Sequence, residues 1–203
     1  MPVAKEARTR KAEQSEATRQ ALLAVARELF ADRGYAGVGT EEIVQRARVT
    51  RGALYHHFRD KKDLFRAVYE RLEAELAEAL SRQLAKRPAD DPIALLSTGA
   101  RAYLDSCMDP ALARIALVDA PSVLGWQEWR EVGERYGLGL VVAGLEGAMA
   151  AGAISDQPAK PLAHLILGAL GEAGMLIANA DDPKAARAEV EPPLLALLQG
   201  LRT

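Results

Sequence analysis

Ten residues of this chain bring together several side chains that could do chemistry. The stretch 49–58, VTRGALYHHF, holds an arginine, a tyrosine and two of the chain's three histidines. Two histidines beside a tyrosine first suggest an acid–base or metal centre. However, neighbouring residues on a helix point about 100° apart, and no cysteine or third histidine stands nearby to complete a metal site. For His56 and His57 we therefore predict no metal, and for the chain no cofactor.

The composition is that of a soluble globular protein. Of the 203 residues, 49% are apolar and 27% are charged, and the many Ala and Leu residues favour helix. The single cysteine, Cys107, excludes an internal disulfide, and we interpret it as a buried apolar residue. The N-terminus has no apolar signal region, and Glu146, His164 and Glu172 interrupt the apolar stretches. We expect no membrane contact and a cytoplasmic location.

The charge is divided unevenly along the chain. The net charge is −2, but residues 1–62 carry 13 Lys and Arg against 8 Asp and Glu, which gives +5. The remaining residues carry 13 against 20, which gives −7. A basic N-terminal part followed by an acidic remainder suggests that only the first part faces a polyanion.

The N-terminal part has the spacing of short helices. Apolar residues recur with helical period from Leu22 to Phe30, and Gly34 is well placed to end that helix. Thr40 is expected to cap a second helix, and a break at 48–50 precedes a third helix from about 51 to 57. Asp60 is expected to cap a long fourth helix. We predict a flexible basic arm at 1–15, which either reaches a minor groove or is a solvated tail, and a DNA-binding domain at 16–62.

The rest of the chain, 63–203, is predicted to be a larger helical domain. Asp-Pro pairs at 91–92, 109–110 and 182–183 mark helix starts. Helices are expected near 91–107, 109–119, 122–151, 158–180 and 182–201. The glycine-rich stretch 122–151 should be kinked or broken, and Pro192–Pro193 should kink or restart the last helix. No strand pattern is visible, so the fold class is all-α, with about nine helices.

Helix, three-residue turn and helix is the geometry of a helix-turn-helix DNA-binding motif. Its second helix enters the major groove. Thr50 and Arg51 stand at the N-terminal end of that helix, where phosphate or guanine can be bound. Gly52 and Ala53 let the backbone approach DNA closely, and Tyr55 and His56 can donate hydrogen bonds to phosphate. Thr50 could alternatively serve only as a helix cap.

The segment ALLAVARELFADRGYAGVGTEEIVQRARVTRGALYHHFRDKKDLFRAV resembles the DNA-binding domain of the TetR (tetracycline repressor) family. The resemblance covers roughly residues 18–70. It implies a homodimer that reads a palindromic operator in double-stranded DNA, with His57 and Phe58 in packing positions. The predicted DNA contacts are Thr40, Arg48, Thr50, Arg51, Gly52, Ala53, Tyr55, His56, Lys61 and Lys62.

Arg48 departs from the family pattern, because the family usually has glycine in this turn. If the turn requires a positive φ, a residue other than glycine costs about 1 kcal/mol. Arg48 either offsets this cost through a phosphate contact or is simply tolerated.

In the family, the C-terminal helices bind a small-molecule effector and form the dimer interface. The predicted effector contacts are Tyr103, Cys107, Met108, Leu117, Asp119, Trp126, Trp129 and Tyr136, each of which could instead be an ordinary core or helix-end residue. Small residues in 158–180 permit close helix packing. The predicted dimer contacts are Leu162, Leu165, Ala169, Ala173, Leu194 and Leu198.

The expected function is therefore transcriptional regulation, by a repressor that an effector releases from its operator. The alternative is a ligand-independent architectural DNA-binding protein. An enzyme is not expected, because the sequence has no nucleophile elbow, metal-ligand spacing or phosphate loop.

Overall fold

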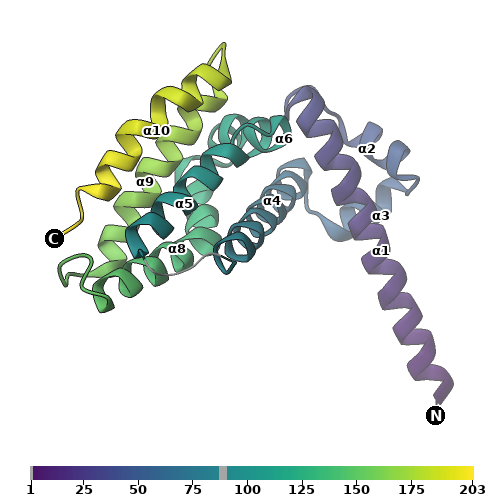
Figure 1. The fold of residues 1–203 in the computed structure, drawn as a ribbon. Helices are drawn as coiled ribbons and strands as arrows, with labels where there is room; N and C mark the ends of the chain where they lie inside the picture. The colour runs from purple at the N-terminus through teal and green to yellow at the C-terminus, as the bar shows by residue number, and fades with distance from the viewer. Residues whose placement is uncertain (1, 87–90) are drawn as a thin grey trace. The chain divides into compact units, whose positions relative to one another are not determined.

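The protein is helical throughout the part of the chain that the structure describes. The computed structural model describes residues 2–86 and 91–203, with side chains from residue 12 onward. Within these ranges the only regular non-helical feature is an isolated antiparallel bridge between Ile154 and Arg202. The described residues form nine helices when the uninterrupted run 110–124 is counted as one, which confirms the predicted all-α fold. The chain divides into two compact units, residues 1–69 and 70–203 (Figure 1).

The first unit is built on α1 (Pro2–Arg33), which packs against α2 (Thr40–Ala47) and α3 (Arg51–His57). The first turns of α4 (Lys61–Leu84) complete it. The rings of Phe30, Tyr35 and Phe65 lie against one another, with centroids 5.1–5.9 Å apart. Buried apolar side chains from all four helices surround them: Leu22, Leu23, Ala26, Leu29, Ile43, Val44, Leu54, Phe58, Leu64 and Val68.

The first helix begins earlier than the sequence suggested. We predicted a flexible arm at 1–15, but α1 starts at Pro2. Residues 3–16 contain no glycine or proline and are rich in Ala, Glu, Lys and Arg, which have high helix propensity. The arm prediction rested on the polar and mixed-charge composition of this segment, which suits a helix as well as a flexible arm. The boundary between the units also differs, since it falls inside α4 after Tyr69 and not after residue 62.

The second unit is a bundle of helices in which α9 (Ala159–Ala178) packs against α8 (Trp126–Ala150), α10 (Pro183–Gln199) and α5 (Pro92–Ser106) (Figure 1). The predicted Asp-Pro starts are confirmed. Asp91, Asp109 and Asp182 each accept hydrogen bonds from two backbone N–H groups of the following turn, and proline takes the first helical position.

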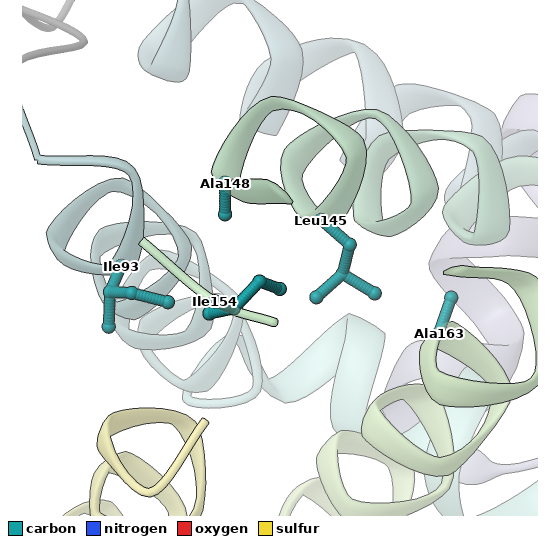
Figure 2. Packing of buried hydrophobic residues seen from close by; sticks show 5 residues of the cluster. All are labelled: Ile93, Leu145, Ala148, Ile154 and Ala163. Carbon is teal, nitrogen blue, oxygen red and sulfur yellow. The ribbon is translucent and has the colours of Figure 1, made fainter. Parts of the chain in front are cut away.

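The core at one end of this bundle joins three helices and a loop. Ile93 of α5, Leu145 and Ala148 of α8, Ile154 of the following loop and Ala163 of α9 are buried together (Figure 2). Thr203 donates its backbone N–H to the carbonyl oxygen of Ala153, which fixes the C-terminus on the same loop. The small side chains of Ala148 and Ala163 let the helices approach closely.

Between α5 and α8 the chain forms a continuous but irregular helical run. It consists of α6 (Pro110–Leu112), the π-helical segment η1 (Ala113–Asp119) and α7 (Ala120–Leu124). The wider π turn brings Arg114 Nε within 3.5 Å of Asp119 Oδ2, an i,i+5 pair. The indole N–H of Trp129 donates to the Ala116 carbonyl oxygen at 2.8 Å. A helix was expected to begin near residue 122, and α7 begins at Ala120 with Pro121 in its first turn, but it continues the preceding helical segment without a break.

The predicted break in 122–151 occurs at Gly125. Of the two outcomes predicted for Pro192–Pro193, the restart does not occur, and the kink stays a prediction. Gly125 has φ 91° and ψ 156° and separates α7 from α8. Both prolines lie inside α10, which continues to Gln199. Side-chain ion pairs hold α10 on α5, with Arg187 Nη2 2.8 Å from Asp105 Oδ1 and Arg101 Nε 2.7 Å from Glu191 Oε1.

Replacing Gly125 by alanine is expected to destabilise the protein by about 1–3 kcal/mol, because its backbone conformation is open essentially only to glycine. The control is Gly139→Ala, in the middle of α8 where an added Cβ meets nothing within 4 Å. That change should stabilise by about 0.5–1 kcal/mol through helix propensity. Urea unfolding measures both, and equal effects of the two substitutions would contradict the role given to Gly125.

Candidate nucleic-acid interface

The turn between α2 and α3 is closed by a Schellman motif with arginine in the left-handed position. Arg48 has φ 55° and ψ 39°, and among the described residues it is the one non-glycine residue with positive φ. The backbone N–H of Arg48 donates to Gln45 at 3.2 Å, and that of Val49 donates to Val44 at 3.1 Å. The positive φ considered for this turn is therefore present, at a cost of about 1 kcal/mol for a residue other than glycine. The Arg48 side chain is exposed, and its phosphate contact stays a prediction.

The start of α3 is fixed by Thr50. This residue has extended backbone angles, and its hydroxyl accepts a hydrogen bond from the backbone N–H of Ala53 at 3.1 Å. Thr50 is therefore a helix cap, and any DNA contact would be additional. Asp60 caps α4 in the same way, with its Oδ1 2.8 Å from the Asp63 backbone nitrogen. At α2 the expected cap is wrong, because Gly39 occupies that position and Thr40 is the first helical residue.

The two faces of α3 differ sharply. Leu54 and Phe58 are buried in the first unit, while Arg51, Gly52, Tyr55 and His56 are exposed. Ala53 is half-buried. The predicted division of this helix into a packing face and an outward face is therefore the observed one.

Arg51 is held by two neighbours on the outward face. Its Nη1 atom lies 2.9 Å from Glu41 Oε1 of α2, and its guanidinium carbon lies 5.6 Å from the centroid of the Tyr55 ring. Glu41 is not among the DNA contacts predicted from the sequence. The pair could not be inferred from helix spacing, because it joins two helices across the turn.

The two histidines have different surroundings, as predicted. His56 is exposed, whereas His57 is half-buried. The pKa of His57 lies below its usual value, mainly because burial disfavours the charged ring, and also because of the charges of His56 and Arg19. The rings stand edge to face, 5.2 Å apart. In the described part of the chain, no group of three or more His, Cys, Asp or Glu residues could hold a metal.

The remaining predicted DNA contacts lie at the edges of the motif. Lys61 is half-buried, with its ammonium 4.1 Å from the centroid of the Tyr35 ring. Lys62 is exposed and Thr40 is half-buried. All three stay predictions as DNA contacts.

The candidate effector residues of the second unit fall into two groups. Tyr103, Cys107 and Leu117 converge on Gly174 of α9, where an added Cβ would lie within 2.8–3.4 Å of all three. Such tight contact is typical of core packing, and burial raises the pKa of the Cys107 thiol to about 12.

The other group lies less deeply in this unit. The rings of Trp126 and Trp129 are 4.9 Å apart, with Trp126 exposed and Trp129 half-buried against Gly171. The carboxylate of Asp119 forms an ion pair with Arg114. Met108 and Tyr136 are half-buried, and their effector contacts, like those of the other residues, stay predictions.

The exposed apolar surface of the second unit only partly matches the predicted dimer contacts. Leu165 is 72% exposed, and Leu162 and Ala169 are half-buried. Ala173, Leu194 and Leu198 are instead buried by their own chain, which leaves little of them for a partner. Two further large apolar residues of these helices are exposed, Leu176 of α9 at 52% and Leu197 of α10 at 65%. Apolar residues lie around much of α9 and of the C-terminal half of α10, so periodicity did not show which face points outward.

Comparisons with known proteins agree with the class that this geometry defines, the helix-turn-helix DNA-binding proteins. Residues 22–68 match the family model for bacterial regulatory proteins of the tetR family, and residues 93–201 match the tetracyclin repressor-like C-terminal domain. Together these matches show that the chain belongs to the tetR family.

Individual relatives support this assignment. The chain is 32% identical over 131 residues to the Transposon Tn10 TetC protein of Escherichia coli, covering 64% of this chain and 65% of that protein. It is 43% identical over 84 residues to the transcriptional regulator AcrR of Shigella flexneri, covering 41% and 39%. The matched region thus spans between about two fifths and two thirds of these curated relatives.

Solved structures share the whole fold. A TetR-family transcriptional regulator from Pectobacterium atrosepticum is 35% identical, with a TM-score of 0.83 over 94% of this chain and 97% of that one. RolR, solved in complex with resorcinol, is 24% identical with a TM-score of 0.69, over 94% and 95% of the two chains. At that identity, RolR shows the fold alone.

Removing the Thr50 hydroxyl tests how the motif is held together. Thr50→Ala is expected to lower the free energy of unfolding by about 1 kcal/mol, because the Ala53 N–H loses the side-chain acceptor of the cap and keeps only the Thr50 carbonyl oxygen. Thr50→Ser keeps the acceptor and should leave the free energy of unfolding nearly unchanged, because serine caps a helix at least as well as threonine. Urea unfolding followed by circular dichroism measures both. Equal losses for the two variants would show that the methyl group, and not the cap, is what matters.

Proposed function

We propose that the protein is a cytoplasmic transcriptional repressor that binds a palindromic operator as a homodimer and is released by a small-molecule effector. The observation that carries this proposal is the outward face of α3. Arg51, Gly52, Tyr55 and His56 are exposed together on a helix whose other face is buried. A major groove admits such a helix, and side chains at its N-terminal end then reach base edges.

Gly52 gives this proposal particular support. A Cβ added at Gly52 would meet only Thr50 Oγ1, at 3.9 Å, so the protein's own packing does not require glycine there. Gly52 also lies in a helix, where glycine is less stable than alanine by about 0.5–1 kcal/mol. A glycine that is neither needed by the fold nor favoured by the helix suits a backbone that must approach another molecule closely.

The exposed apolar face of α9 and α10 supports the homodimer. Leu165, Leu176 and Leu197 lie on two adjacent helices, and each is more than half exposed. Pairing this face with the same face of a second copy would form a four-helix interface with twofold symmetry. Of the described helices, α9 alone is also long and apolar enough, by length and composition, to cross a membrane. Its packing against α5, α8, α10 and η1, together with the exposed Glu172, favours the protein interface.

Effector binding is assigned to the second unit. RolR, whose fold this chain shares, was solved with resorcinol. The half-buried Trp129 and Tyr136 and the Trp126 ring offer aromatic surface of the kind that ligand sites use. Effector binding would weaken operator binding by about 1–3 kcal/mol, and operator binding would weaken effector binding by the same amount. The long helix α4 enters both units and is the covalent path for this coupling.

The alternative function is an architectural DNA-binding protein without an effector. It predicts uniform coverage of DNA and no preferred sequence. Footprinting on the DNA upstream of the protein's own gene separates the two, since a repressor protects a discrete palindrome.

Gly52→Ala is expected to separate folding from DNA binding. The variant should be as stable as the wild type or up to about 1 kcal/mol more stable, because alanine favours helix. Its affinity for the protected palindrome should fall by about 5–150-fold, because a methyl group placed in a close-packed interface typically costs about 1–3 kcal/mol. Urea unfolding and fluorescence anisotropy measure the two quantities. Unchanged DNA affinity would contradict the proposal that the backbone of α3 approaches DNA closely at Gly52.

Charges placed on the exposed apolar face should dissociate the dimer. The double variant Leu165→Glu, Leu197→Glu loses two leucines, each worth about 1.5–3 kcal/mol when buried, and sets like charges against each other across a twofold axis. Its dimer dissociation constant should rise by at least about 100-fold in sedimentation equilibrium. Ala143→Glu, at an exposed position of α8, is the control and should leave the dimer intact. A double variant that stays dimeric would place the interface elsewhere.

A further inference from the structure

The ion pair between Glu41 and Arg51 places an acidic group in the centre of a surface that should bind a polyanion. We propose that Glu41 determines specificity: it leaves Arg51 free to contact a base but opposes the use of Arg51 on phosphate. The inference rests on the proposed DNA-binding function and concerns one residue of the same interface.

The geometry holds Arg51 from two sides. Glu41 Oε1 lies 2.9 Å from Nη1 in an ion pair, and the guanidinium carbon lies 5.6 Å from the Tyr55 ring centroid. The pair joins the first turn of α2 to the first turn of α3, across the turn of the motif. Both side chains are about two-thirds exposed, at 67% and 69%, so neither is held there by burial.

The neighbouring carboxylate, Glu42, cannot replace Glu41. It is paired with Arg33 of α1, with Nη2 to Oε2 at 2.6 Å, and this bond ties α2 to α1 inside the first unit. The two adjacent acidic residues therefore have separate partners. Glu42 stabilises the packing of α2 on α1, whereas Glu41 pairs with the exposed Arg51.

The chemistry of the guanidinium allows the pair to survive base contact. Nη1 carries two N–H groups, so one can remain on Glu41 while the other, together with Nη2, faces the acceptors of a guanine. A phosphate contact is different, because the acceptor is itself an anion, whereas the acceptors of a guanine are neutral. A phosphate bound by the same guanidinium is repelled by the nearby Glu41 carboxylate, beside a duplex that carries one negative charge about every 1.7 Å.

Glu41 therefore weakens binding in which Arg51 contacts a DNA phosphate. On random DNA, where no guanine lies opposite Arg51, a phosphate contact is the one that remains available to this side chain. On the operator, the base contact keeps the ion pair. The expected result is a larger ratio of operator affinity to random-DNA affinity than an uncharged residue at 41 would allow.

The test uses the full-length protein and a duplex that the wild type selects from a randomised pool. Affinities for this duplex and for a scrambled duplex are measured over a range of salt concentrations. Glu41→Gln should bind the scrambled duplex about tenfold more tightly and the selected duplex within about threefold of the wild type. Its salt dependence on scrambled DNA should steepen by about 0.9, the slope of one added phosphate contact.

Two further variants isolate the effect. Glu28→Gln removes the same charge from an exposed position of α1 and should shift both affinities equally. In an Arg51→Ala background, Glu41→Gln should change the affinities for the selected and the scrambled duplex equally, because the guanidinium that Glu41 pairs with is absent. Thermal unfolding of Glu41→Gln checks that the exposed substitution leaves the fold intact.

The inference is overturned if Glu41→Gln strengthens both duplexes to the same extent, as a general charge effect would. It is also overturned if the only change is weaker binding of the selected duplex, since Glu41 would then merely position Arg51. If the wild type selects no sequence from the pool, the proposed function itself has failed, and that outcome is distinct from the other two.

Discussion

The burial of Leu54 and Phe58 is the constraint on which the interface depends. The helix α3 has only seven residues, and isolated helices shorter than about 12–15 residues are marginal in water. It persists because its two apolar side chains are buried in the core of the first unit and because Thr50 caps its first turn. Because the buried side chains fix the orientation of α3, they also determine that Arg51, Tyr55 and His56 face outward.

The same division into fixed and free faces governs the second unit. Its helices start at aspartate caps and pack around α9, while Arg187 and Arg101 hold α10 to α5 through ion pairs. What these contacts leave uncovered is an apolar surface on α9 and α10. The unit is thus internally well determined and still has a face that a second protein surface can cover.

Much of this architecture could be predicted from the sequence, because local rules determine it. Apolar spacing predicted the helices, and aspartate followed by proline predicted three starts that the structure has. The absence of glycine at Arg48 pointed to strain, and that residue is left-handed. Other features depend on tertiary contacts that no local pattern contains. Glu41 and Arg51 stand ten positions apart on different helices, and the exposure of Leu176 and Leu197 depends on which apolar face turns inward.

The π-helical segment at Ala113–Asp119 changes how residues on either side of it should be compared with those of relatives. A π turn holds one residue more than an α turn, so the chain beyond it is rotated by about 100° from where an uninterrupted α-helix would place it. A relative that lacks one residue here would therefore not have a shorter loop, since the run contains none. It would have a plain α-helix over this stretch, without the extra residue of the π turn. A single-residue gap at this point in an alignment would thus indicate a change from π-helix to α-helix within an uninterrupted helical run.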